Sequence, residues 1–274
     1  MRSKQKVNID ASVACVKDAD VVVFAGGISP LLEGEEMGVN LPGFRGGDRT
    51  DIELPAVQRE LIHALHRAGK KIILVNCSGS PIALEPETKN CEAILQAWYP
   101  GQAGGTAVAD VLFGDYNPGG RLPVTFYRNM SQLPDFEDYN MTGRTYRYMT
   151  QQPLFPFGYG LSYTTFEYGN LSLAKEQIKV GEPLKLTVNV TNNGQRDGEE
   201  VVQVYLKKQD DAEGPGKTLR AFKRVRIPAG KSGEVVFDLN GKELEWWDAQ
   251  SNTMRVCAGR DDVMVGNSSE DRDL

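Results

Sequence analysis

Leu54-Pro-Ala-Val-Gln-Arg-Glu-Leu-Ile-His-Ala-Leu-His-Arg-Ala-Gly-Lys-Lys-Ile-Ile-Leu-Val-Asn76 decides the fold of the first half of the chain. Its first part carries apolar residues at the spacing of a helix, with Pro55 suited to the first turn and Gly69 suited to the end. Its last part, from Lys71, is an apolar run with the length of a buried strand. The stretch therefore predicts a helix that leads directly into a strand, as in α/β proteins.

Further apolar runs on either side extend this pattern. Asp20–Ala25 is followed by two glycines and predicts a buried strand. Cys91–Trp98 predicts a third strand, and Gly104–Phe113 predicts a helix that ends at Gly114. Strands that alternate with helices form a mostly parallel sheet with helices on both faces. We therefore expect an α/β domain over residues 1–160.

From Leu161 onward the apolar pattern changes to the period of a strand. Pro183–Val190 alternates apolar and polar residues, as a half-buried strand does. Similar segments, separated by turn signals, follow at Glu200–Leu206, Ala221–Ile227 and Gly233–Leu239. Such a series predicts an antiparallel immunoglobulin-like sandwich. Because the Cys…Trp…Cys signature of immunoglobulin domains is absent, we expect a fibronectin-III-like, all-β domain over residues 161–274.

The segment Pro118–Gly160, before the predicted sandwich, has few periodic runs and is expected to be irregular. Aromatic residues are frequent in and around it. They could stack on sugars, but packing in the core and between the domains is the preferred interpretation. These residues are Trp98, Tyr99, Tyr146, Tyr148, Phe155, Phe157 and Tyr159.

The composition is that of a globular protein. The chain has 274 residues, of which 40% are hydrophobic and 25% charged, and its formal net charge is −6. These values exclude an intrinsically disordered chain. The apolar run Val21–Ala25 is too short for a transmembrane helix, and no basic face suits nucleic acid. We therefore expect neither a membrane nor a nucleic acid as partner. Arg2, Lys4 and Lys6 are not followed by an apolar region, so we expect no signal peptide in this chain.

Neither a metal nor a cofactor is expected. The sequence contains no phosphate-binding loop, no dinucleotide fingerprint and no nucleophile elbow. Cys77 could form a nucleophilic dyad with a histidine, but both histidines occupy a helix with apolar flanks. The cysteines and histidines are too scattered for a zinc site: Cys15, Cys77, Cys91, Cys257, His63 and His66.

The loop after the first strand carries the best candidate for chemistry. Glu33, Glu35 and Glu36 lie within four positions, and crowded carboxylates repel one another, which can keep one of them protonated near neutral pH. Gly46-Gly47 predicts a sharp bend, after which Asp48 and Arg49 could pair and position a ligand. A solvated acidic loop is the alternative. The loop follows a parallel strand, however, where sites of α/β sheets are found.

Five motifs together resemble the C-terminal half of a glycoside hydrolase family three enzyme. They are Glu33-Gly-Glu-Glu-Met37, Gly47-Asp-Arg-Thr-Asp-Ile-Glu-Leu-Pro55, Trp98-Tyr-Pro-Gly-Gln102, Tyr116-Asn-Pro-Gly-Gly-Arg-Leu-Pro-Val-Thr-Phe126 and Phe155-Pro-Phe-Gly-Tyr-Gly-Leu-Ser-Tyr-Thr-Thr-Phe166. The resemblance covers nearly the whole chain and implies an α/β sandwich followed by a fibronectin-III-like domain. It is closer to the β-xylosidase branch than to the β-glucosidase branch.

The resemblance also implies roles for residues. In the family, an N-terminal (β/α)₈ barrel supplies an aspartate nucleophile, and the α/β domain supplies the general acid/base glutamate. The matching motif implies Glu35 as the acid/base, with Glu33 as the second candidate. It further implies Glu33, Asp48 and Arg49 as substrate-binding residues, and an oligosaccharide as substrate.

The 274 residues are taken up by the two later domains. The resemblance therefore implies a C-terminal part of a retaining, exo-acting β-glycosidase, inactive without the barrel of its parent chain, in a periplasmic or secreted protein. Other classes remain open. A non-catalytic carbohydrate-binding module would present the sandwich to sugars, whereas a small flavodoxin-like hydrolase or redox domain would need a nucleophile or cofactor motif.

Overall fold

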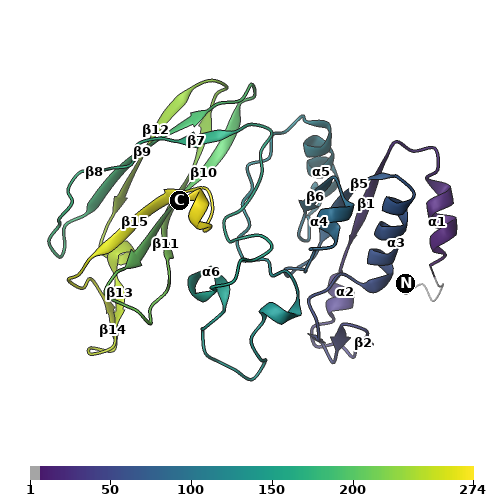
Figure 1. The fold of residues 1–274 in the computed structure, drawn as a ribbon, viewed down its shortest axis with the longest axis horizontal. Helices are drawn as coiled ribbons and strands as arrows, with labels where there is room; N and C mark the ends of the chain where they lie inside the picture. The colour runs from purple at the N-terminus through teal and green to yellow at the C-terminus, as the bar shows by residue number, and fades with distance from the viewer. Residues whose placement is uncertain (1–6) are drawn as a thin grey trace. The chain divides into compact units, whose positions relative to one another are not determined.

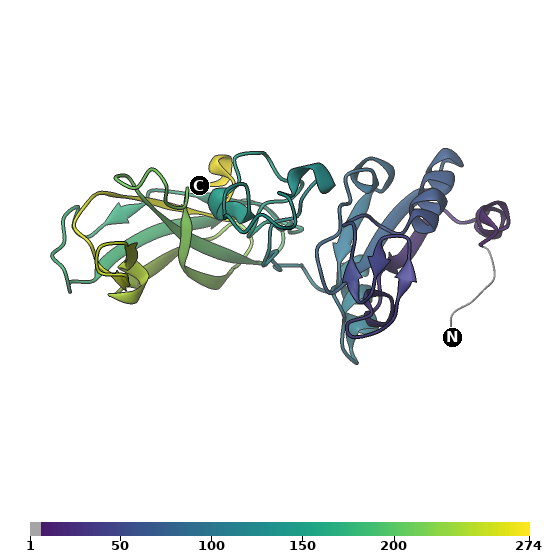
Figure 2. The ribbon, with the colours of Figure 1, turned by 90° about the horizontal axis from the view of Figure 1, so that it is seen from below.

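The computed structural model describes residues 7–274 and divides them into two compact units (Figure 1 and Figure 2). The first unit extends to Ala109 and includes Phe126–Phe136, and the second consists of Asp110–Thr125 and Glu137–Leu274. The basic residues at the start of the chain, on which the signal-peptide prediction depends, lie outside the described residues. Within residues 7–274, no helix has the length and apolar character needed to cross a membrane.

The first unit is built on a parallel sheet, as predicted. Its strands are β1 (Val21–Gly27), β5 (Lys71–Cys77) and β6 (Ala93–Gln96), in the order β1-β5-β6. β5 is central and carries the buried apolar residues of the sheet, which is why its run has no polar alternation. All three strands run in the same direction, so the loops that follow them emerge at one edge.

Helices accompany this sheet. They are α1 (Ile9–Cys15), α2 (Pro30–Glu33), α3 (Ala56–Arg67), α4 (Glu87–Asn90), α5 (Gly104–Phe113) and the 3₁₀ turn η1 (Met130–Gln132). α3 confirms the opening prediction, since it starts after Pro55 and ends before Gly69, whose φ of 74° is left-handed. Ile62 and Leu65 form its buried face, and α3 contacts β1 and β5.

The loop between β1 and α3 contains a small antiparallel sheet that the sequence pattern did not predict. Its strands are β2 (Asn40–Leu41), β3 (Phe44–Arg45) and β4 (Asp48–Arg49). The turns between them use Gly43, Gly46 and Gly47, all of which have positive φ. The predicted sharp bend at Gly46-Gly47 is therefore the turn that joins β3 to β4.

The second unit is the predicted β-sandwich. One sheet has the order β11-β10-β15, the other has the order β12-β9-β7 with β8 also paired to β9, and β13 and β14 form a separate pair. Their bounds are β7 (Phe166–Tyr168), β8 (Ser172–Leu173), β9 (Leu184–Asn192), β10 (Gly198–Lys208), β11 (Thr218–Ile227), β12 (Ser232–Leu239), β13 (Trp246–Asp248), β14 (Thr253–Arg255) and β15 (Asp261–Gly266). Alternate residues of β9 enter the core, which explains its period of two. The short helices here are α6 (Thr145–Tyr148), η2 (Lys242–Leu244) and η3 (Asp271–Asp273).

Residues 114–125 and 137–160, which are irregular apart from α6, belong to the same compact unit as the sandwich. Arg121 forms an ion pair of 2.7 Å with Glu200 of β10, and both side chains are buried. Tyr146 stacks on Phe157 and meets Tyr205 edge-on, so these aromatics pack together as preferred. The division between the compact units falls inside α5. The domain boundary that the sequence predicts after Gly160 stays a prediction.

Candidate functional site

The loop after β1 reverses direction at Gly34. Ser29 caps the short helix α2 by accepting a hydrogen bond from the Leu32 amide (3.3 Å). Gly34 ends α2 in the left-handed conformation (φ 66°), and a Cβ added there would lie 2.2 Å from Cγ2 of Val39. Only glycine satisfies both demands, since it has no Cβ and tolerates positive φ. The reversal at Gly34 therefore places Glu33 and Glu35 in different surroundings, one half-buried and the other exposed.

Glu33, before this reversal, is half-buried and held by hydrogen bonds. The hydroxyl of Tyr99 donates to its Oε2 (2.6 Å), and the hydroxyl of Ser80 donates to its Oε1 (3.2 Å). Ser80 follows β5 and Tyr99 follows β6, so the carboxylate joins the loops that leave all three parallel strands. Burial, followed by the hydrogen bond to Glu33, raises the pKa of Tyr99, which keeps its hydroxyl protonated as a donor.

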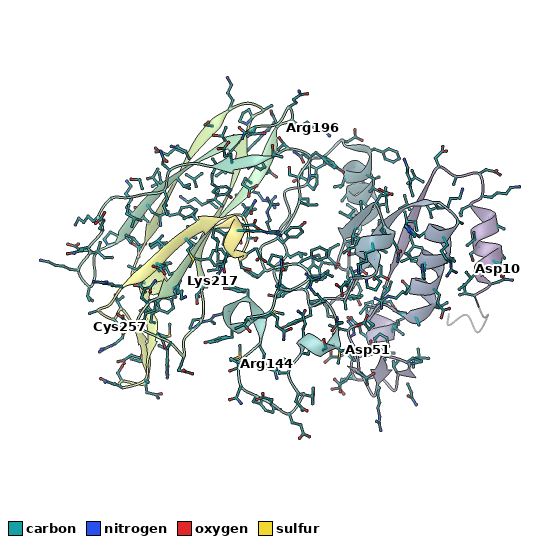
Figure 3. The ribbon with its side chains drawn as sticks, in the orientation of Figure 1. Asp10, Asp51, Arg144, Arg196, Lys217 and Cys257 are labelled. Carbon is teal, nitrogen blue, oxygen red and sulfur yellow. The ribbon has the colours of Figure 1, made fainter. Side chains whose placement is uncertain are left out.

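Arg49, at the end of β4, completes this cluster. Its Nη1 donates to the Ser80 hydroxyl (3.1 Å) and to the Pro81 carbonyl (3.3 Å), and its Nη2 donates to the Glu53 carbonyl (3.3 Å). Its Nε is buried without a hydrogen-bond partner. Burial lowers the pKa of Arg49, whereas the negative charges of Asp51, labelled in Figure 3, and Glu33 oppose that shift.

Glu35, Glu36 and Asp48 lie on the solvent side of the same loop. All three side chains are exposed, in contrast to the half-buried Glu33. Glu36 has a φ of 53°, which is uncommon for a residue with a side chain and shows that the loop turns tightly there. Among the ion pairs of the described residues, none joins Asp48 to Arg49, although the sequence suggested that they could pair. The Arg49 guanidinium instead turns to Ser80 and to backbone carbonyls, because these acceptors lie on its buried side.

A glutamine side chain holds the start of the loop. Gln58 of α3 accepts a hydrogen bond from the Gly27 amide and donates one to the Gly27 carbonyl, both at 2.7 Å. The Ile28 amide donates to the Cys77 carbonyl (2.8 Å), which continues the β1–β5 pairing by one residue. Hydrogen bonds to α3 and to β5 therefore hold the chain in place between β1 and α2.

Sequence reasoning missed three members of this site: Gln58, Ser80 and Tyr99. Ser80 is not singled out in the sequence analysis, and Tyr99 is grouped there with the packing aromatics. The signal that could have found them is their position, because Ser80 and Tyr99 both follow the carboxyl end of a parallel strand.

The cysteines and histidines were also considered as candidates for chemistry. Over residues 7–274, no group of three or more His, Cys, Asp or Glu side chains could hold a metal ion. In the same range, no hydrogen bond joins Cys77 to His63 or His66, and both histidines are exposed. Burial raises the pKa of the Cys91 thiol to about 12, which makes it an unreactive thiol near neutral pH.

Comparisons with known proteins agree with this architecture. Residues 2–163 match the glycosyl hydrolase family 3 C-terminal domain, and residues 200–269 match a fibronectin type III-like domain. A xylan 1,4-beta-xylosidase of Xylanibacter ruminicola is 56% identical over 98% of the chain, and a periplasmic beta-glucosidase of Salmonella typhimurium is 37% identical over 98%.

Solved structures show the same fold. A β-glucosidase from Erythrobacter marinus superposes with a TM-score of 0.82 at 38% identity over 96% of the chain. A family 3 β-glucosidase from Bifidobacterium adolescentis superposes with a TM-score of 0.83 at 32% identity over 98%. The chain spans only about a third of its curated relatives, 31% of the xylosidase and 36% of the periplasmic enzyme. Its motifs, its fold and these matches show that the chain belongs to glycosyl hydrolase family 3.

Proposed function

We propose that this chain is the C-terminal part of a retaining, exo-acting β-glycosidase that hydrolyses O-glycosyl bonds of plant-type oligosaccharides. β-Xylosides are the proposed substrates, because the relative that is 56% identical is named a xylan 1,4-beta-xylosidase. β-Glucosides are the alternative, since several relatives and solved structures are named β-glucosidases. A periplasmic or secreted location is proposed from the relative named as periplasmic.

One observation carries the assignment of Glu35 as general acid/base. It is the exposed carboxylate directly after the Gly34 reversal, on a loop that hydrogen bonds hold at both ends. A general acid must reach the glycosidic oxygen, so its carboxyl has to be accessible while the loop that carries it stays in place. Glu33 is the second candidate, but Tyr99 and Ser80 already occupy its two oxygens.

In the proposed reaction, Glu35 protonates the departing oxygen and then activates water as a base. The nucleophile would come from the N-terminal barrel of the parent chain, and the two carboxyl groups of a retaining glycosidase stand about 5–5.5 Å apart. Asp48 and Arg49 are the proposed sugar contacts. No metal or cofactor takes part in the proposal.

The test joins this chain to the N-terminal two thirds of the Xylanibacter relative, in place of the matching 272 residues. We expect the chimera to hydrolyse aryl β-xylosides and this chain alone not to do so, because one carboxylate cannot complete the covalent step. Glu35→Gln should slow substrates with poor leaving groups by about 10²- to 10⁴-fold and spare activated ones. Azide should restore turnover of the activated substrates, since azide needs no base.

Glu36→Gln is the matched control, because Glu36 is an exposed neighbour on the same loop. It should show no dependence on the leaving group. If Glu36→Gln and Glu35→Gln behave alike, Glu35 is not the acid/base. If this chain alone hydrolyses the substrate, the requirement for the barrel is wrong. If this chain binds oligosaccharides and the folded chimera never turns them over, the alternative of a carbohydrate-binding module is favoured.

A further inference from the structure

Glu33 is half-buried and hydrogen-bonded, whereas Glu35, the proposed proton donor, is exposed. Both of its oxygens accept hydrogen bonds, from Tyr99 at 2.6 Å and from Ser80 at 3.2 Å. Ser80 in turn accepts a hydrogen bond from Arg49 at 3.1 Å. The carboxylate of Glu33 is therefore an acceptor in this cluster, because the hydroxyl groups of Tyr99 and Ser80 each donate to it.

The four side chains of this cluster come from four different segments. Glu33 follows β1, Ser80 follows β5, Tyr99 follows β6, and Arg49 ends β4. Glu33 and Tyr99 are 66 positions apart in sequence, so their hydrogen bond joins the two outer strands of the parallel sheet across its edge. The loop that carries Glu35 is therefore anchored to the rigid part of the unit two residues before that carboxylate.

Gly79 provides the space for this anchor. A Cβ added at Gly79 would lie 2.7 Å from Cε2 of Tyr99 and 3.0 Å from Oε2 of Glu33. Gly79 does not have a positive φ, so the backbone conformation does not require glycine there. The contact between Tyr99 and Glu33 therefore requires a residue without a side chain at position 79.

We propose that Glu33 is a positioning residue, held by Tyr99 and Ser80, which sets the place of Glu35 and does not itself donate the proton. This inference rests on the proposed function, in that it assigns the acid/base role to Glu35. Its structural part, the anchoring of the loop, does not depend on catalysis. The two parts can therefore be tested separately.

The anchoring is tested on this chain by amide hydrogen exchange over residues 33–49 in Tyr99→Phe. A hydrogen bond to a charged group is lost, so we expect exchange in this loop to accelerate on the order of 10- to 100-fold. Tyr116→Phe is the matched control, because the exposed Tyr116 also donates to a glutamate, Glu199 (2.9 Å), in the other compact unit. The control should leave exchange in residues 33–49 unchanged. Equal exchange in the two variants would overturn the anchoring.

The role in the reaction is tested in the chimera described above, with aryl β-xylosides of graded leaving groups. Tyr99→Phe and Glu33→Gln should each lower kcat by about tenfold, with KM little changed, and the double variant should lose no more than either alone. Azide should rescue Glu35→Gln far more than Glu33→Gln, in which Glu35 is still present. The opposite pattern, with full azide rescue in Glu33→Gln and none in Glu35→Gln, would make Glu33 the proton donor. An inactive chimera would contradict the proposed function and leave the exchange result standing.

Discussion

Replacement of Arg121 by methionine should lower the free energy of unfolding of the second unit by about 3–5 kcal/mol. Arg121 is 7% exposed and Glu200 is fully buried, and their ion pair is 2.7 Å long. Methionine fills the space of the arginine stem but leaves the Glu200 carboxylate without its cation. Tyr168 would still donate to Oε1 of Glu200 (3.0 Å), so one of the two oxygens keeps a partner. The loss arises from the uncompensated buried charge.

Two further variants separate this cause from a general effect of lost charge. Arg224→Met removes a similar ion pair, between Arg224 and Glu199 (3.3 Å), in which the side chains are 49% and 33% exposed. Water solvates both groups there, so the loss should be at most about 1 kcal/mol. The double variant Arg121→Met/Glu200→Gln should recover much of the stability, because no buried charge remains.

Trp98 lies in the first unit, so every variant is compared in a Trp98→Phe background. Urea unfolding of this chain, followed by the fluorescence of Trp246 and Trp247 in β13, then measures the transition of the second unit. Arg121→Met should shift the midpoint to lower urea with an unchanged slope. A loss below about 1 kcal/mol, equal to that of Arg224→Met, would refute the reasoning that burial makes this pair indispensable. A double variant as unstable as Arg121→Met would show that lost packing, and not the unpaired charge, is the cause.

Three other predictions follow from local features. The pKa of Cys91 is raised from 9.0 to about 12, so the stability that its neutral thiol contributes is complete below pH 9 and should be lost as the pH rises toward 12. Urea unfolding should therefore give a lower free energy of unfolding at pH 10.5 than at pH 8, and Cys91→Ala should lack this decrease. Gly34→Val forces a branched side chain into positive φ at a cost of about 1–2 kcal/mol and makes it clash with Val39, so hydrogen exchange in the loop should accelerate. Gly46→Ala, whose Cβ would meet nothing within 4 Å, should have a smaller effect. Equal effects of the two variants would exclude the clash with Val39 as the cause. Limited proteolysis should spare the chain around Tyr159, whose carbonyl accepts from the Leu122 amide (2.8 Å), and early cleavage there would contradict the prediction that the domains do not separate at this point.

The sequence by itself determined the long helix and strands and the family, but not the small sheet of β2, β3 and β4. The helical spacing after Pro55 and the apolar run from Lys71 predicted α3 and β5, and the alternation in Pro183–Val190 predicted β9. These predictions were confirmed because the spacing of apolar residues and the length of an apolar run depend on which face of a single helix or strand is buried. That information is contained in the local sequence. The motifs around Glu33 and Gly47 indicated the family for a similar reason, since short segments carry them.

Only the tertiary structure decided what each polar side chain contacts. The partners of Glu33 are 47 and 66 positions away, and the partner of Arg121 is 79 positions away. Such contacts form when the carboxyl ends of parallel strands meet, or when an irregular segment packs on a sheet, and no local pattern encodes the resulting distance. The crowded glutamates illustrate this limit, because the sequence places them together, whereas the Gly34 reversal leaves Glu33 half-buried and Glu35 exposed. A left-handed glycine and two hydroxyl donors from other loops, rather than residue type, distinguish the two carboxylates.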